Sequence, residues 1–306
     1  MKSFISTLFF FILLTSLTGC YSDSHESELS FNQAHTLEFL PALKGDYFKM
    51  ESKNVGRAYH IYIRFPEGYH SDQKTQEIKK SYPIIYLLDG DSLFPILAAN
   101  HLFLSYDDLV PEAIVVGIAY GSFDPEINKR SYDFSLPAAD NDPERGGAEK
   151  FLNFLEGELL PTVESRYLAD PNQRVLFGQS RGGHFVLYTA FTRPNLFKGF
   201  IASNPTFLPQ KDFFYGKPHS ANRDDLNLVI TSGENDTQKL RGDALTWNAH
   251  WSKQEEMPWE ITFKTIPAGS HAANSTDSYR LGLNVIFRDE IAQQHHQTAG
   301  GAHEQY

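Results

Sequence analysis

The chain has a single cysteine, Cys20, among its 306 residues. One thiol excludes an intramolecular disulfide and any zinc site built from several cysteines. Basic side chains are also few, since 27 lysines and arginines stand against 38 aspartates and glutamates and give a formal charge of −11. Because nucleic-acid-binding proteins carry patches rich in lysine and arginine, this balance argues against a nucleic-acid partner.

Long apolar runs are missing apart from one. With 41% hydrophobic and 21% charged residues, the composition is that of a globular protein and excludes a disordered chain or a polytopic membrane protein. The exception is residues 4–17, which follow Lys2. This run is too short for a comfortable membrane span and is typical of the apolar part of a secretory signal.

The apolar run ends at residues 17–20, Leu-Thr-Gly-Cys, which resemble the lipobox of bacterial lipoproteins. The resemblance implies that the chain is cut before Cys20 and that the thiol carries a diacylglycerol, which would hold the protein on a membrane. Tyr21 follows, so nothing resembles an inner-membrane retention signal, and this favours the outer membrane. We therefore expect an exported, periplasmic, lipid-anchored protein. An ordinary cleaved signal with an incidental cysteine is the alternative.

Four segments follow from these patterns. Residues 1–19 are predicted to be the signal peptide, and the small polar residues 20–30 a flexible tether. Residues 31–292 contain no linker rich in proline, glycine or serine and are predicted to form one domain. Residues 293–306 have little apolar content and are predicted to be a disordered tail. The tail histidines are not expected to bind a metal, because no rigid element holds them, and we expect no cofactor.

Strand-like and helix-like segments alternate through the domain. Strands are predicted at residues 35–40, 47–51, 59–65, 83–88, 113–119, 174–177, 198–202, 226–231 and 260–266. Helices are predicted at residues 146–167, with a kink at Pro161, and at 181–191, 247–254 and 278–291. This order predicts an α/β fold, a doubly wound and mostly parallel sheet with helices on both faces. The first two strands should be antiparallel edge strands.

Ser180 lies in the segment Gly-Gln-Ser-Arg-Gly, residues 178–182, between a predicted strand and a predicted helix. Such a tight turn needs small residues beside the serine, and it lifts the hydroxyl above the sheet edge. The N–H of Arg181 would then lie at a helix N-terminus, where it can stabilise an oxyanion. The pattern predicts that Ser180 is a catalytic nucleophile. A glycine-rich packing turn is the alternative.

A serine nucleophile needs a base, and the sequence offers one in a suitable loop. His271 follows the predicted strand 260–266, and loops at such strand ends gather ligand sites in open α/β sheets. The acid is expected after strand 226–231, in keeping with the order serine, acid, histidine. Asp236 is favoured because it is far enough round the turn to face back over the sheet, and Glu234 is the alternative.

A second oxyanion donor is expected in the loop after the predicted strand 83–88. Gly90 lets the backbone approach a substrate closely, so the N–H of Gly90 or of Asp91 is the predicted donor, together with the N–H of Arg181. A plain Asp-Gly turn that ends the strand is the alternative.

Residues 57–290 resemble the esterase-D-like branch of the α/β-hydrolases, which includes hydrolases of trilactone siderophores. Besides the three catalytic segments, the resemblance rests on residues 86–90 (Tyr-Leu-Leu-Asp-Gly), 115–118 (Val-Val-Gly-Ile), 130–134 (Arg-Ser-Tyr-Asp-Phe) and 203–205 (Ser-Asn-Pro). It implies that Arg130 and Tyr132 line the substrate side. A loop pinned to the body by pairing of Arg130 with Asp133 is the alternative.

The expected activity is that of a serine esterase acting on a small-molecule ester. The reaction would pass through an acyl-enzyme, and siderophore-type esters are favoured among the substrates. The same branch resembles acyltransferases and carbohydrate-acyl esterases for feruloyl or acetyl groups, and these are the alternatives. The side chain of Arg181 would bring positive charge to the mouth of the site. The oligomeric state stays open.

Overall fold

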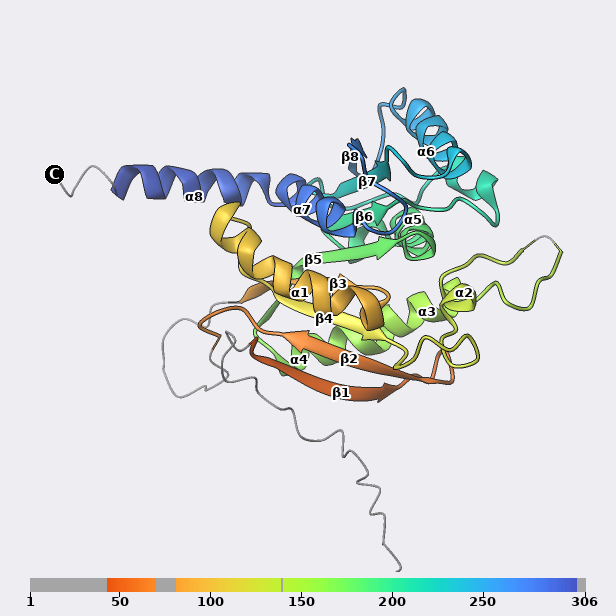
Figure 1. Ribbon diagram of the computed structural model, residues 1–306, viewed down its shortest axis with the longest axis horizontal. Helices are drawn as coiled ribbons and strands as arrows, with labels where there is room; N and C mark the ends of the chain where they lie inside the picture. The colour runs from red at the N-terminus through yellow and green to blue at the C-terminus, as the bar shows by residue number, and fades with distance from the viewer. Residues whose placement is uncertain (1–42, 70–80, 139, 302–306) are drawn as a thin grey trace, which may run out of the picture. The chain divides into compact units, whose positions relative to one another are not determined.

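One sheet organises the described part of the chain. The computed structural model describes residues 43–69, 81–138 and 140–301, and within these ranges eight strands lie in the order β1-β2-β4-β3-β5-β6-β7-β8 (Figure 1). They are β1 Gly45–Glu51, β2 Ala58–Arg64, β3 Tyr82–Leu87, β4 Ile114–Ala119, β5 Ala169–Gln179, β6 Gly199–Ser203, β7 Asn227–Gly233 and β8 Glu260–Ile266. The pairs β1–β2 and β2–β4 are antiparallel, and the other pairs are parallel. The predicted α/β fold is confirmed. The predicted strand 35–40, the signal and the tether lie outside the described residues.

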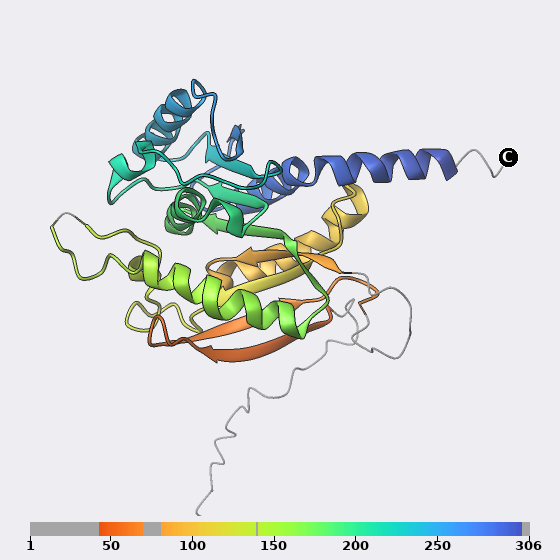
Figure 2. The same ribbon diagram turned by 180° about the vertical axis from the view of Figure 1, so that it is seen from behind.

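Helices cover both faces of this sheet (Figures 1 and 2). α1 Gly90–Asp107 and α7 Ser275–Ile286 lie on one face and contact each other. The opposite face carries α5 Arg181–Thr192 and a long helical segment made of α3 Ala148–Phe154, η1 Leu155–Leu159 and α4 Leu160–Arg166. The other described helices are α2 Arg130–Asp133, α6 Gln238–Trp251, α8 Arg288–Gly301 and two 3₁₀ turns, η2 Pro194–Leu196 and η3 Lys211–Tyr215. No helix in the described ranges is both long and apolar enough to cross a membrane.

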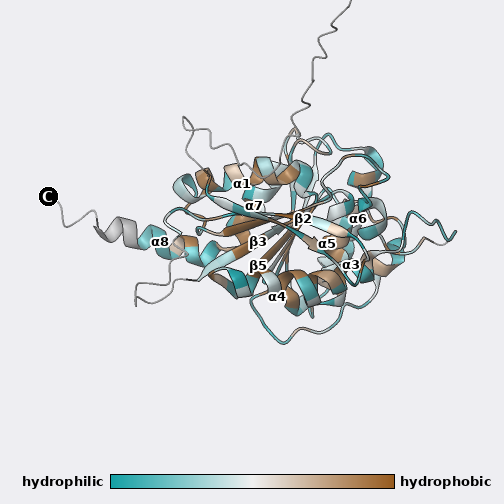
Figure 3. Ribbon diagram, turned by 90° about the horizontal axis from the view of Figure 1, so that it is seen from below, coloured by the Kyte–Doolittle hydropathy of each residue, from teal (hydrophilic) through white to brown (hydrophobic). Residues whose placement is uncertain are grey.

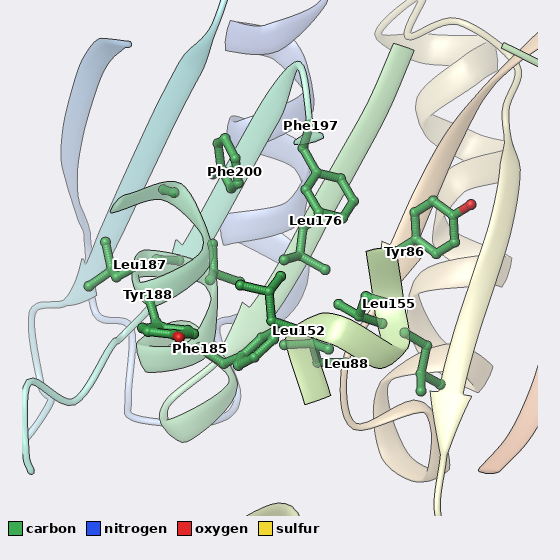
Figure 4. Packing of buried hydrophobic residues seen from close by; sticks show 14 of the residues in the cluster. Tyr86, Leu88, Leu152, Leu155, Leu176, Phe185, Leu187, Tyr188, Phe197 and Phe200 are labelled. Atoms are coloured by element: carbon green, nitrogen blue, oxygen red, sulfur yellow. The ribbon is translucent and has the colours of Figure 1, made fainter. Parts of the chain in front are cut away.

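The core lies in two layers, one on each side of the sheet. Side chains alternate along a strand, so Leu87 and Phe177 pack toward α1 and α7, whereas Tyr86 and Leu176 pack toward the opposite helices (Figure 4). Strands covered on both faces are apolar throughout, as the brown central strands in Figure 3 show. This explains why β3 and β4 have the continuous apolar runs from which they were predicted.

The predicted kink at Pro161 takes the form of a wider helical turn. The chain passes from α3 through the π-helical turn η1 into α4, and the proline is near the start of α4. Proline has no N–H to donate to the carbonyl of Gly157, four residues earlier, and a π turn accommodates the break without ending the helix.

The sequence did not predict α1. Asp89, which precedes the helix, and Gly90, its first residue, are typical of a turn, and Pro95 lies within the helix. These signals masked the helical spacing of two buried leucines, Leu93 and Leu97. The position of the helix bears on function. Its N-terminus follows β3 closely, at the carboxyl ends of the parallel strands, where the second oxyanion donor is predicted.

Residues 293–301, which the sequence predicts to be part of the tail, continue the helix α8. The first turn of α8 is attached to the body of the protein. Lys198 pairs with Glu290 at 2.6 Å, and Ile291 packs against the core layer on the α7 side. These contacts hold the start of a helix that the polar composition of residues 293–301 did not indicate.

A buried histidine, His101 on α1, makes folding sensitive to acid. The hydroxyl of Tyr279 lies 3.0 Å from its Nδ1, and the carbonyl of Pro111 lies 3.1 Å from its Nε2. This pairing suits a neutral ring that accepts at Nδ1 and donates from Nε2. Burial lowers the pKa of His101 from 6.5 to about 3. Below pH 6.5 the unfolded chain therefore binds a proton that the folded chain does not, and stability falls as the pH falls.

We predict that this residue removes about 2–3 kcal/mol of folding free energy between pH 6.5 and pH 4.5, at ~1.4 kcal/mol per pH unit. Urea unfolding across this range should show a smaller loss for His101→Gln than for the wild type. The exposed His219 supplies the matched control, because His219→Gln should keep the wild-type slope. Equal slopes for wild type and His101→Gln would contradict the prediction.

Candidate active site

Ser180 occupies a strained turn between β5 and α5. Its φ is 59° and its ψ is −110°, a region that non-glycine residues rarely adopt and that costs about 1–3 kcal/mol. The turn is held by hydrogen bonds from the Ser180 N–H to the carbonyl of Ser203 at 2.8 Å and from the N–H of Thr206 to the Ser180 carbonyl at 3.2 Å. A Cβ at Gly178 would lie 2.5 Å from the backbone of Gly182, so only glycine allows the helix to leave so close to the strand.

The structure brings Ser180, His271 and Asp236 into one hydrogen-bonded line. His271 Nε2 lies 2.8 Å from Ser180 Oγ, and His271 Nδ1 lies 3.0 Å from Asp236 Oδ2. The Asp236 side chain is 1% exposed, whereas that of His271 is 36% exposed. A buried carboxylate that accepts from Nδ1–H leaves Nε2 as the acceptor for the serine proton. This is the arrangement that activates a serine for attack on an ester.

Glu234, the alternative acid, has a different contact. Its carboxylate accepts the N–H of Ala268 at 2.9 Å and thereby holds the loop that leads to His271. Ala268 has a φ of 55°, so this side chain stabilises a turn with an uncommon backbone conformation. The geometry favours Asp236 as the partner of His271 and gives Glu234 a role in the loop.

Two amide side chains that the sequence did not identify as functional hold the base loop in place. The side chains of Gln179 and Asn204 both donate to the carbonyl of His271, the latter at 3.0 Å. Asn204 also accepts the N–H of Gly233 at 2.6 Å and donates to Asn274 at 2.6 Å. One buried amide therefore connects the end of β6 with the acid loop and the base loop. The Ser-Asn-Pro segment at residues 203–205 was the available sequence signal.

We predict that Asn204→Asp lowers kcat for ester hydrolysis by about tenfold to a hundredfold, because a small misplacement of the base is costly. The new carboxylate can still accept from Gly233, but it repels the His271 carbonyl that Asn204 donates to. The change should also alter the pH profile of kcat, which a purely structural defect would not. Asn195→Asp on an exposed turn is the matched control. Unchanged kcat and pH profile in folded Asn204→Asp would refute this role.

The predicted oxyanion donors lie at two helix N-termini, and one of them, Asp91, lines the pocket that contains Ser180. Arg181 begins α5 and Gly90 begins α1, and the first N–H groups of a helix have no intrahelical acceptor. The pocket has a volume of about 280 Å³ and includes Asp91, Ser180 and His271 in its wall. The side chain of Arg181 donates to the hydroxyl of Ser135 at 2.9 Å, which fixes the direction of the guanidinium without neutralising its charge.

Arg130 lines the pocket, and its ion-pair partner is not Asp133, the partner named in the alternative interpretation of the sequence. It forms a bidentate pair with Asp89, at 2.6 Å from Nε to Oδ1 and 2.8 Å from Nη2 to Oδ2. Burial acts to lower the pKa of Arg130, but the Asp89 carboxylate outweighs it, and the pKa is raised. The suggested pairing of Arg130 with Asp133 is wrong, because Asp133 is buried against Arg57 and two tyrosine hydroxyls.

Tyr132 is not among the residues that line the pocket beside Ser180. Its ring lies against Gly147, where a Cβ would come within 2.5 Å of it, and the guanidinium of Arg57 is 5.8 Å from the ring centroid. The lining of the pocket beside Ser180 consists of Asp89, Asp91, Ser92, Leu93, Phe123, Asn128, Arg130, Gln179, Ser180 and His271. Of the two residues predicted to face substrate, Arg130 is therefore the one at the pocket.

The fold and the site together define the class of protein. A serine on a strand-to-helix turn, with a histidine and a carboxylate from the ends of later parallel strands, is the arrangement of α/β-hydrolases. The enzyme is a carboxylic ester hydrolase. A family model described as "Putative esterase" matches residues 52–298, and the chain belongs to this esterase family.

The chain is similar to proteins from bacteria and from a fungus. The ferri-bacillibactin esterase BesA of Bacillus subtilis is 32% identical over 207 residues, covering 60% of this chain and 68% of BesA. The siderophore triacetylfusarinine C esterase of Aspergillus fumigatus is 31% identical over 173 residues, covering 55% of this chain and 57% of that protein. The crystal structure of the BES protein from Bacillus cereus matches with a TM-score of 0.69 and 25% identity, covering 81% of this chain and 96% of that one.

Proposed function

We propose that the protein hydrolyses siderophore-type esters, with Ser180 as nucleophile, His271 as base and Asp236 as acid. The observation that carries the proposal is the line of hydrogen bonds from Ser180 Oγ through His271 to the buried Asp236. The choice of substrate class is supported by the names of the two relatives, both of which are siderophore esterases.

The reaction follows from the geometry. Ser180 Oγ attacks the ester carbonyl carbon while His271 Nε2 takes the hydroxyl proton, and Asp236 stabilises the imidazolium that forms. The N–H of Arg181 and that of Gly90 or Asp91 donate to the oxyanion of the tetrahedral intermediate. The intermediate expels the alkoxide, which takes the proton from His271, and an acyl-enzyme remains. Water activated by His271 then releases the acid and restores Ser180.

A substrate panel tests the proposed specificity. A trilactone siderophore, a feruloyl sugar, an acetyl sugar and p-nitrophenyl butyrate are compared by kcat/KM, with products identified by mass spectrometry. We expect the trilactone to have the highest kcat/KM and its linear acid to be the product. A higher kcat/KM for either sugar ester, or acyl transfer to an added alcohol in preference to water, would replace the proposal with one of the two alternatives.

We also propose that the protein is exported and held on the outer membrane by lipid at Cys20. The support is the Leu-Thr-Gly-Cys sequence at residues 17–20 after an apolar run, with Tyr21 next. In a bacterial host, the wild type should incorporate a labelled fatty acid and partition into detergent, and Cys20→Ala should do neither. Tyr21→Asp, by creating the aspartate that the sequence lacks, should shift the protein to the inner membrane. An unlabelled wild type would rule out the anchor.

A further inference from the structure

A second pocket adjoins the one that holds Ser180. Its volume is about 360 Å³, and it shares two wall residues, Asp91 and Phe123, with the first pocket. Neither Ser180 nor His271 is part of its lining. A substrate bound at the serine can therefore extend into this space past Asp91 and Phe123.

Aromatic rings form the walls of the second pocket. The rings of Tyr62 on β2 and Phe94 on α1 are stacked, with centroids 5.6 Å apart and planes at 28°. Phe94 covers Gly117 of β4, where a Cβ would lie 2.7 Å from the ring, so the glycine permits this close packing. Two rings that pack on the sheet in this way make a rigid, flat surface.

Phe123 completes the pocket from the loop after β4. Phe123 is 73% exposed. The start of that loop is held by Asp91, whose carboxylate accepts the N–H groups of Tyr120 and Gly121, each at 2.7 Å. The exposed ring thus stands at the boundary of the two pockets on an anchored segment.

We propose that the second pocket binds a planar aromatic group in the acyl part of the ester, with Phe123 as a specificity-determining residue. Aromatic walls favour a flat ring, because stacked and edge-to-face pairs contribute beyond simple burial of area. The leaving alcohol must stay near His271, because His271 returns a proton to it. His271 lines the first pocket and does not line the second. The arm that reaches past Asp91 therefore belongs to the acyl part. This inference rests on the proposed esterase function.

Two esters with the same leaving group isolate the ring. p-Nitrophenyl 3-phenylpropanoate and p-nitrophenyl 3-cyclohexylpropanoate differ in having a planar or a puckered six-membered ring of similar size. The readout is the ratio of their kcat/KM values, which cancels any general loss of activity. We expect the wild type to prefer the phenyl ester, and Phe123→Ala to reduce the ratio about tenfold. Phe123→Trp, which keeps an aromatic face, should retain the preference.

Phe103→Ala is the matched control, because Phe103 is another exposed phenylalanine, 62% exposed, on α1 and outside both pockets. Its ratio should equal that of the wild type. Hydrolysis of both esters with no preference for the phenyl ring, or an unchanged ratio in Phe123→Ala, overturns the inference and leaves the esterase function intact. Hydrolysis of neither ester by the wild type overturns both.

Discussion

Ser180→Ala should lower kcat for p-nitrophenyl butyrate by about 10⁶-fold, to the level left by oxyanion donors and binding alone. The nucleophile has no substitute, because the base His271 is aligned on its Oγ at 2.8 Å. The fold should survive, since the hydroxyl's hydrogen bond is to His271 and the backbone of the turn is held independently by Ser203 and Thr206. Initial rates, thermal unfolding and labelling by a fluorophosphonate probe measure the three expectations.

Ser165→Ala is the control for this experiment, because Ser165 is exposed on α4. It should keep wild-type activity and probe labelling. If folded Ser180→Ala retained substantial hydrolysis, Ser180 could not be the nucleophile and another group would have to attack the ester. If the probe failed to label the folded wild type, the chain would act as a binding protein on a hydrolase fold.

Asp236→Asn should lower kcat by about 10²-fold to 10⁴-fold without unfolding the chain. The carboxylate accepts from His271 Nδ1 and stabilises the imidazolium, whereas a neutral amide does not carry the compensating charge and can favour the wrong tautomer. Because Asp236 also accepts the N–H of Thr237 at 2.6 Å, which the asparagine oxygen can still do, the backbone at the start of α6 should be preserved. Steady-state kinetics and thermal unfolding test both points.

Glu234→Gln is the matched change two residues away. Glutamine can still accept the N–H of Ala268, so kcat should stay within a few-fold of the wild type. A larger loss in Glu234→Gln than in Asp236→Asn would reverse the assignment of the acid and would require the base loop to rearrange before catalysis.

The sequence predicted those parts of the structure that are encoded locally. A few neighbouring residues are enough to predict the strands β3 and β4, from their apolar runs, and the turn at Ser180, from its glycines. α1 was missed because local turn signals at Gly90 and Pro95 competed with its helical spacing. In α1, the packing of the buried leucines against the sheet favours the helix over a turn, and no local sequence pattern shows this packing.

Side-chain partners were harder to predict than elements. Asp236 and Glu234 are two residues apart in one turn, and only the fold of that turn shows which carboxylate meets His271. The partner of Arg130 is Asp89, 41 residues away in the chain, although Asp133 is much nearer in sequence. Asn204 acts through loops that are brought together only when β6, β7 and β8 pair.

The amide of Asn204 has a consequence for how such an enzyme can change. It ties the loop of the acid to the loop of the base, so a substitution that breaks either of these hydrogen bonds disturbs the position of the base. Phe123 lies on a separate segment, fixed to the start of α1 by Asp91. Evolution or engineering can therefore alter residues 122 and 123, which line the second pocket, to admit new acyl groups while the reaction centre stays as it is.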